Sequence, residues 1–406
     1  MVCTSTRVRI LCVVVLMLCC GGESGRAGAV PPLIISEFRL RGPAGATDEF
    51  IEVLNESVGP HTVRGLSGTG YGIAASDGVT RCTIPDGTVI PSRGHFLCVN
   101  SNGYSLGGVP AGSGSTATGD ATYALDIPDN AGIALFNNNS GGASYSMENR
   151  ADAVGSTSET NTLYKEGAGY LPWPLPLPRE GAWVRLTPGS CARGTCTPQS
   201  RPPATFGLVD SNDNNNDFYY TDTTGGISIP DGRVQRLGAP GPQALSSPAY
   251  EWGGEVTPAR VSGCSSSDMA PNRIRDVTPG PALTSPLGTL DLRVKWLNRS
   301  SVPVTRLRFR VVDLTIWPVP FGTADLRVLS ADPRTVTVDN YPCGTPDGGD
   351  LLAATTLDQP AQSNGGGLNS GLSVNAVTPA MPFDSGATSA SVSGSASRRR
   401  GSRGSA

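Results

Sequence analysis

The sequence predicts an all-β protein with two domains of short strands. Glycine (52 residues) and proline (34 residues) make up about a fifth of the 406 residues, and both are common in turns and unfavourable inside helices. Apolar runs of strand length recur between turn sequences. Only 16% of the residues are charged and the net charge is −3, so no overall field attracts nucleic acid or an anionic membrane.

Residues 1–29 have the features of a secretory signal peptide. A basic start precedes an apolar run at residues 10–20, which is too short to span a bilayer, and small residues precede a cleavage point near Ala29. A lipoprotein anchor at Cys19 or Cys20 and an uncleaved anchor helix are the alternatives. No other segment has the apolar length of a membrane span. The sequence therefore predicts a secreted or envelope-associated protein, either extracellular or periplasmic.

Export makes disulfides the expected state of the cysteines that remain after cleavage, because their number is even and the compartment is oxidising. Proximity along the chain suggests Cys82 with Cys98 and Cys191 with Cys196, which leaves Cys264 with Cys343, although six cysteines allow fifteen connectivities. A zinc site is the alternative. The chain has no C-x-x-C motif and only two histidines, His61 and His95, which argues against zinc.

The first β domain is predicted over residues 30–243. Its opening strands are expected at residues 33–40 and 49–55, where partly alternating apolar runs lie between turns. Residues 101–122 and 137–165 contain few apolar side chains, so we expect long surface loops there.

A linker is expected at residues 244–272, followed by a second, smaller β-sandwich over residues 273–380. Within it, residues 289–298 and 305–314 each place apolar side chains on one face and are predicted to form a hairpin. Residues 381–406 are rich in Ser, Gly and Arg and almost lack apolar side chains, which predicts a disordered tail.

Four segments of the first domain together resemble the lamin-tail domain of exported bacterial proteins: "LIISEFRLRGPAGATDEFIEVLNES", "GLSGTGYGI", "IPDGTVIPSRGHFLCVN" and "RLGAPGPQALSSP". The resemblance implies an immunoglobulin-like β-sandwich with long loop insertions. It also implies a binding or scaffolding role, because the family has no known catalytic residues.

The second domain is similar to the companion domain that follows lamin-tail domains in large bacterial proteins, through "VTRLRFRVVDLTIW", "ADLRVLS" and "NGGGLNSGLS". In such domains we expect one or two further apolar strands after "GLNSGLS". Here Ser, Gly and Arg follow, as a truncation or a change of reading frame would produce, so we expect the second sandwich to lack an edge strand.

The carboxylates of the opening strands are the first candidates for catalysis, since paired carboxylates can act as general acid and base. Strand alternation places Glu37 on one face with Ile35 and Arg39, and it places Glu49 and Glu52 on opposite faces. We therefore expect ordinary sheet positions. A hydrolase with a loop-built active site using Glu37 and Glu52 is the alternative function.

The strongest candidate for a metal site is a calcium-binding loop. Oxygen-bearing side chains occupy every second position in it, at Asp210, Asn212, Asn214 and Asn216. The loop lacks the glycine and the closing glutamate of an EF-hand, because Thr221 stands at the twelfth position. The alternative is an Asn- and Asp-rich turn. No other cofactor is predicted.

A stripe of three arginines, Arg306, Arg308 and Arg310, alternates along one predicted strand. It is either a solvated strand face or a surface for phosphate or acidic polysaccharide. Together these patterns favour an exported, non-enzymatic binding or scaffolding module in adhesion or envelope organisation. Its expected partner is a protein or polysaccharide of the envelope or extracellular matrix, and no nucleic acid is expected.

Overall fold

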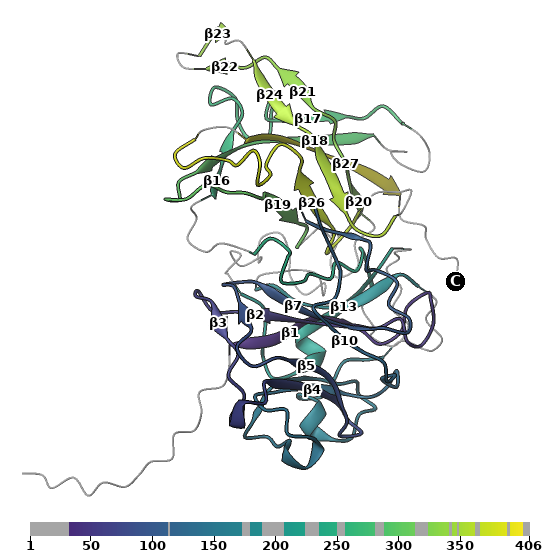
Figure 1. The fold of residues 1–406 in the computed structure, drawn as a ribbon. Helices are drawn as coiled ribbons and strands as arrows, with labels where there is room; N and C mark the ends of the chain where they lie inside the picture. Colours follow the sequence, from purple (N-terminus) through teal and green to yellow (C-terminus); the bar gives the residue numbers. More distant parts are fainter. Residues whose placement is uncertain are drawn as a thin grey trace, which may run out of the picture.

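The computed structural model describes residues 32–112, 114–172, 179–188, 207–223, 235–249, 256–280, 288–312, 324–340, 343–346, 349–361, 366–387 and 390–400. In these ranges the chain is almost entirely β (Figure 1), which confirms the all-β prediction. The helical elements there are α1 (Asn214–Asp217) and three 3-10 turns, η1 (Leu66–Gly68), η2 (Gly142–Ser144) and η3 (Thr162–Tyr164). No helix in the described ranges combines the length and hydropathy that crossing a membrane requires.

A seven-stranded sheet forms the centre of the first unit, by which we mean strands β1 to β15. The strand order is β10 (Ala121–Tyr123), β7 (His95–Asn100), β2 (Phe50–Asn55), β1 (Leu33–Arg39), β13 (Gly181–Arg185), β14 (Phe218–Asp222) and β15 (Gln235–Leu237). The pairings are antiparallel except β10 with β7 and β14 with β15. The two predicted opening strands are therefore central neighbours in this sheet.

A four-stranded sheet packs against one face of the seven-stranded sheet. Its order is β12 (Arg150–Val154), β11 (Ile133–Phe136), β4 (Tyr71–Ala75) and β5 (Thr80–Ile84). The main apolar core contains side chains from both sheets, for example Ile35 and Ile51 from one and Ile73 and Leu135 from the other. The Cys82–Cys98 disulfide joins β5 to β7 and so links the two sheets.

Short pairs complete the first unit: β3 (His61–Thr62) with β6 (Val89–Ile90), and β8 (Pro110–Gly112) with β9 (Ser115–Thr116).

The second unit, strands β16 to β27, lies beyond the other face of the seven-stranded sheet (Figure 1). Its larger sheet comprises β16 (Val256–Arg260), β18 (Thr289–Asn298), β27 (Ala390–Arg400), β24 (Asp350–Ala353) and β21 (Arg334–Val336), with β17 (Arg273–Asp276) paired to β18 and β20 (Ala324–Leu329) paired to β27. A second sheet comprises β19 (Arg308–Arg310), β26 (Gly371–Val374) and β25 (Thr355–Asp358), and β22 (Asp339–Asn340) pairs with β23 (Thr345–Pro346).

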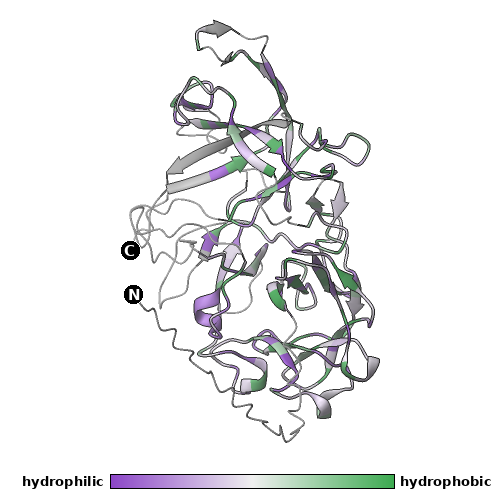
Figure 2. Cartoon of the chain, turned by 90° about the vertical axis from the view of Figure 1, so that its left-hand side faces the viewer, coloured by the Kyte–Doolittle hydropathy of each residue, from purple (hydrophilic) through white to green (hydrophobic). Residues whose placement is uncertain are grey.

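Hydrophobic residues lie on the strands of both units, interspersed with hydrophilic ones (Figure 2). In the second unit, buried apolar side chains form two clusters, one around Leu307, Val374 and Phe383 and one around Val336 and Leu352. The Cys264–Cys343 disulfide also lies in this unit. Cys82–Cys98 is a pair that sequence proximity suggested, and Cys264–Cys343 is the pair that remained. Cys191, Cys196 and the predicted signal peptide at residues 1–29 lie outside the described residues.

The prediction of a disordered tail is wrong for Ala390–Arg400, which form β27 in the middle of the larger sheet. This strand pairs with β18, β20 and β24, so backbone hydrogen bonds to three neighbours order a segment whose composition alone indicates disorder. β18 thus pairs with β27 on one side and with β16 and β17 on the other, and the expected lack of an edge strand in the second sandwich stays a prediction.

Three local expectations need correction. The segments predicted as a hairpin do form β18 and β19, but these strands pair with other partners in different sheets. The expected linker contains β16, which belongs to the larger sheet of the second unit. The second expected surface loop contains β12, an edge strand of the four-stranded sheet. In each case long-range strand pairing outweighs the local pattern.

Candidate functional site

Glu37 and Glu52 are directly paired across β1 and β2. The register shifts between Ile35 and Glu37, so one residue, Ser36, is unpaired, as in a β-bulge. The bulge moves Glu37 away from the face of Ile35, which points into the core between the sheets. The prediction that Glu37 and Ile35 share a face is therefore wrong. Both carboxylates lie on the outer face of the seven-stranded sheet, and both side chains are fully buried.

The segment after β15 covers the two carboxylates. The Gly241 amide donates to Glu37 Oε1 at 2.8 Å, and the Gln243 amide donates to Glu52 Oε2 at 2.6 Å. Ser36, the bulged residue, donates its hydroxyl to Glu52 Oε1 at 2.5 Å. Each of the two buried carboxylates therefore accepts a hydrogen bond from a backbone amide of the first unit, in addition to any contact with the second unit.

The second unit completes this site, which we call the joint: Glu37, Glu52, Gln243, Arg308, Arg310 and Asn369. Arg310 donates to Glu37 Oε2 at 3.0 Å, and Asn369 donates to the same oxygen at 2.9 Å. Arg308 contacts the Gln243 side-chain oxygen and pairs with Asp358 at 3.0 Å. Two arginines of the predicted stripe thus lie between the units, which corrects both the solvated-face and the ligand-surface interpretations for them.

Apolar and backbone contacts reinforce the joint. Leu368 of the second unit packs with Val184 and Tyr219 of the first. The Leu368 amide also donates to Leu237, and Gly238 and Leu368 form an isolated β-bridge. Arg306 reaches only the carbonyl of Ser246, at an exposed position.

Burial controls protonation in the joint. Burial, followed by repulsion from Glu37, raises the pKa of Glu52 to about 8, so Glu52 is mostly protonated at neutral pH. Burial also raises the pKa of Glu37, but the Arg310 guanidinium opposes this shift. Burial and then the two arginines lower the pKa of His95, 3.7 Å from Glu52, to about 3. With Glu52 and His95 neutral, Glu37 and Asp358 balance the two arginines.

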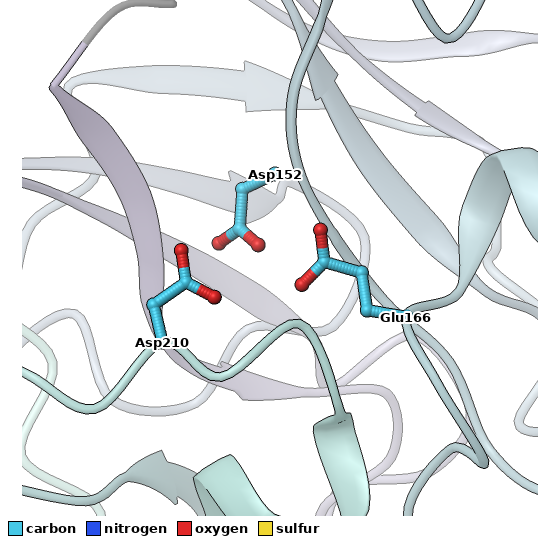
Figure 3. A group of neighbouring side chains, drawn as sticks. All are labelled: Asp152, Glu166 and Asp210. Atoms are coloured by element: carbon cyan, nitrogen blue, oxygen red, sulfur yellow. The ribbon is translucent and has the colours of Figure 1, made fainter.

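A second group of buried acids lies in the first unit. Asp152 on β12, Glu166 after η3 and Asp210 before α1 each place a carboxylate oxygen within 4.8 Å of the others, and we call these three residues the acidic cluster. Figure 3 shows their carboxylates pointing toward one another. Asp152 is 1% exposed and Glu166 6%, whereas the Asp210 side chain is 34% exposed and gives the cluster an edge at the surface.

Arg185, at the end of β13, lies against the acidic cluster and is fully buried. Its guanidinium is 2.5 Å from Asp152 Oδ2, 3.5 Å from Asp210 Oδ1 and 3.7 Å from Asp217 Oδ2. It also donates to the Ile35 carbonyl at 2.8 Å and stacks over the Phe218 ring. Arg185 therefore ties β13 to the loop before α1 through one side chain.

Glu166 is the least satisfied member of the acidic cluster. Its Oε1 accepts from Arg150 at 3.2 Å, while its buried Oε2 has no hydrogen-bond partner. Burial, followed by repulsion from Asp152 and Asp210, raises the pKa of Glu166 to about 8. Burial also raises the pKa of Asp152, although Arg185 opposes that shift.

The predicted calcium loop contributes one residue, Asp210, to the acidic cluster. Asn214 is not available as a ligand, because its side-chain oxygen accepts from the Gly155 and Glu166 amides at 2.9 and 3.0 Å. Asn216 donates its side-chain amide to Asp213, and Asn212 adopts a positive φ of 55° in the turn. The prediction that Asn214 is one of four calcium ligands is therefore wrong. The segment is a structural turn that carries Asp210.

Sequence reasoning missed Asp152, Glu166 and Arg185. Asp152 lies in a segment that we expected to be a surface loop, and Glu166 is the residue that follows this segment. The available signal was the short run "RADAV", in which Ala151 and Ala153 flank Asp152 on a strand. No local pattern connects these residues to Arg185.

Comparison with known proteins adds no identification, since none of the family models, curated proteins or solved structures searched matches the chain.

Proposed function

We propose that this chain is an exported, non-enzymatic binding or scaffolding module that acts in adhesion or in organisation of the envelope or matrix. The resemblance to lamin-tail domains supports this role, with the first unit as the immunoglobulin-like β-sandwich. The two disulfides of the described residues are in keeping with an oxidising compartment. The partner is a protein or polysaccharide of the envelope or extracellular matrix.

The observation that carries the proposal is the joint. Arg310 reaches from β19 to the buried Glu37 on β1, and Leu368 packs against Val184 and Tyr219. In this pair the Glu37 side chain is fully buried and the Arg310 side chain is 25% exposed. The pair and the apolar contact beside it favour one arrangement of the units, because separating the units removes the counter-charge of Glu37. Such a fixed arrangement suits a module that presents a constant surface to a partner.

The joint also weighs against the hydrolase alternative. Glu37 and Glu52 do meet, as a catalytic pair requires, yet both side chains are fully buried beneath Gly241, Gln243 and Arg310. A general acid or base must lie within hydrogen-bond reach of the substrate. The second unit occupies that space, so a substrate reaches these carboxylates only if the units separate.

The proposal is tested by affinity capture with the immobilised mature protein, using envelope and matrix fractions as the source of partners. We expect saturable retention of one component by the parent and equal retention by Glu52→Gln, since Glu52 is already neutral at pH 7. A reduced and unfolded sample of the same protein is the control for nonspecific adsorption.

A parallel screen for hydrolysis of peptide and glycan substrates tests the alternative. Turnover by the parent that Glu52→Gln abolishes, with the variant still folded by circular dichroism, would reverse the choice between the two functions.

A further inference from the structure

The acidic cluster carries more negative charge than its surroundings neutralise. The contacts join four carboxylates, those of Asp152, Glu166, Asp210 and Asp217, to two guanidinium groups, those of Arg150 and Arg185. With all four carboxylates ionised the group has two uncompensated negative charges, and with Glu166 protonated it has one. Buried charges of one sign are costly unless a counter-charge is present, and one divalent cation neutralises the fully ionised group.

The available oxygens also have the geometry of an ion site. One carboxylate oxygen from each member of the acidic cluster lies within 4.8 Å of the other two, and two ligands on opposite sides of one calcium ion are separated by about 4.6–5.2 Å. Asp152 Oδ2 is committed to Arg185 and the Ile35 amide, while Oδ1 accepts only from the adjacent Ala153 amide. Asp152 thus retains an oxygen with a free lone pair.

Glu166 supplies an independent sign of a ligand. Its side chain is 94% buried, since it is 6% exposed, and its Oε2 has no hydrogen-bond partner. Buried oxygens are almost always satisfied, and an orphaned one in a polar group indicates an ion, a water molecule or a proton. Figure 3 shows this carboxylate directed at the carboxylates of Asp152 and Asp210.

We infer that Asp152, Glu166 and Asp210 bind one calcium ion, with Glu166 Oε2 as the central ligand and with Arg150 and Arg185 neutralising the remaining carboxylate charge. The ion enters past Asp210, the exposed member.

The ligand set selects calcium by chemistry and by shape. Carboxylate oxygens are hard ligands, and the cluster offers no histidine or cysteine for zinc. Calcium accepts irregular coordination and completes it with water, which fits a site with one exposed edge. Magnesium requires shorter bonds and a near-octahedral arrangement. The bound ion would tie β12, the segment after η3 and the loop before α1 together, so it stabilises the first unit.

Thermal unfolding of the full chain, in chelator and with added calcium, tests the inference. At calcium about a hundred times the Kd, we expect the parent Tm to rise by about 5 °C. Isothermal titration should give one ion per chain, with magnesium binding more weakly. Glu166→Gln and Asp210→Asn should lose the calcium-dependent Tm rise, and Asp129→Asn should keep it, because Asp129 pairs with Arg41 outside the cluster.

Two results would overturn the inference. If millimolar calcium gives neither heat nor a Tm rise in the parent, Glu166 is satisfied by a proton and the cluster is not an ion site. If calcium raises the Tm of Asp210→Asn as much as that of the parent, the ion binds elsewhere. The Asp210 side chain is 34% exposed and Asn is nearly isosteric with Asp, so Asp210→Asn still tests the inference if Glu166→Gln fails to fold.

Discussion

The joint and the acidic cluster bury similar groups, yet they differ in how their charge is balanced. In the joint, Glu37 faces Arg310, Arg308 faces Asp358, and Glu52 is held neutral by burial. At the acidic cluster, two arginines face its three carboxylates and that of Asp217, and one oxygen of Glu166 has no hydrogen-bond partner. Buried acids thus serve as structural contacts where the sequence supplies matching donors, and the acidic cluster, where donors are fewer, is where we propose a bound ion.

Loss of Arg185 should have the largest effect of any single change in either region. Arg185→Met leaves Asp152 buried beside Glu166 without its cation, which should cost about 3–5 kcal/mol of unfolding free energy. Denaturant unfolding measures this change. Adding Asp152→Asn should restore part of the loss, because the unpaired charge is then removed.

The matched control for that variant is Arg273→Gln, which removes an exposed pair with Asp268 and should cost at most about 1 kcal/mol. A loss from Arg185→Met as small as that of the control would contradict the importance of charge balance in the cluster.

Breaking the joint should cost less, because its carboxylates keep their backbone donors. In a double-mutant cycle of Glu37→Gln and Arg310→Gln, we expect a coupling of about 1.5–3 kcal/mol, the range for a hydrogen bond to a charged group. Arg306→Gln, on the same stretch of chain but bonded only to the Ser246 carbonyl, should change stability little. Additive effects of Glu37→Gln and Arg310→Gln would show that the ion pair does not hold the units together.

The last prediction concerns the pH dependence of stability. The folded-state pKa of Glu52, about 8, lies above its unfolded value, so the folded state retains a proton that the unfolded state loses. The contribution of Glu52 to stability is therefore complete below about pH 4 and is lost as pH rises through 8. Glu52→Gln should make the decline of the unfolding free energy between pH 5 and 8 less steep, by the slope that corresponds to about one bound proton. Denaturant unfolding at several pH values across that range measures this slope. If the slope of unfolding free energy against pH is the same in Glu52→Gln as in the parent, a group other than Glu52 titrates in this range.

Much of the strand content was predictable from the sequence because apolar runs and turn residues are local signals. The expected strands at residues 33–40 and 49–55 match β1 and β2 within two residues. Given the expected export, one disulfide followed from proximity and the other was the pair that remained. These features depend on short stretches of chain or on simple counting.

The remainder depended on contacts between distant segments. The bulge at Ser36 reverses the face of Glu37, and nothing in "IISEF" marks that extra residue. Ala390–Arg400 become a central strand only because β18, β20 and β24 supply hydrogen-bond partners. Asp210 belongs both to the predicted calcium loop and to the acidic cluster, but the other members of the loop were assigned from local spacing, whereas Asp152 and Glu166 lie more than forty residues earlier in the chain.

The most direct test of the contrast between the two regions is a crystal structure of the full chain grown with calcium and soaked in a lanthanide ion. We predict an anomalous peak bonded to Asp152, Glu166 Oε2 and Asp210, and no peak at Glu37 and Glu52, where the charges already balance. A map without a peak at the acidic cluster, or with an equal peak at the joint, would contradict the account.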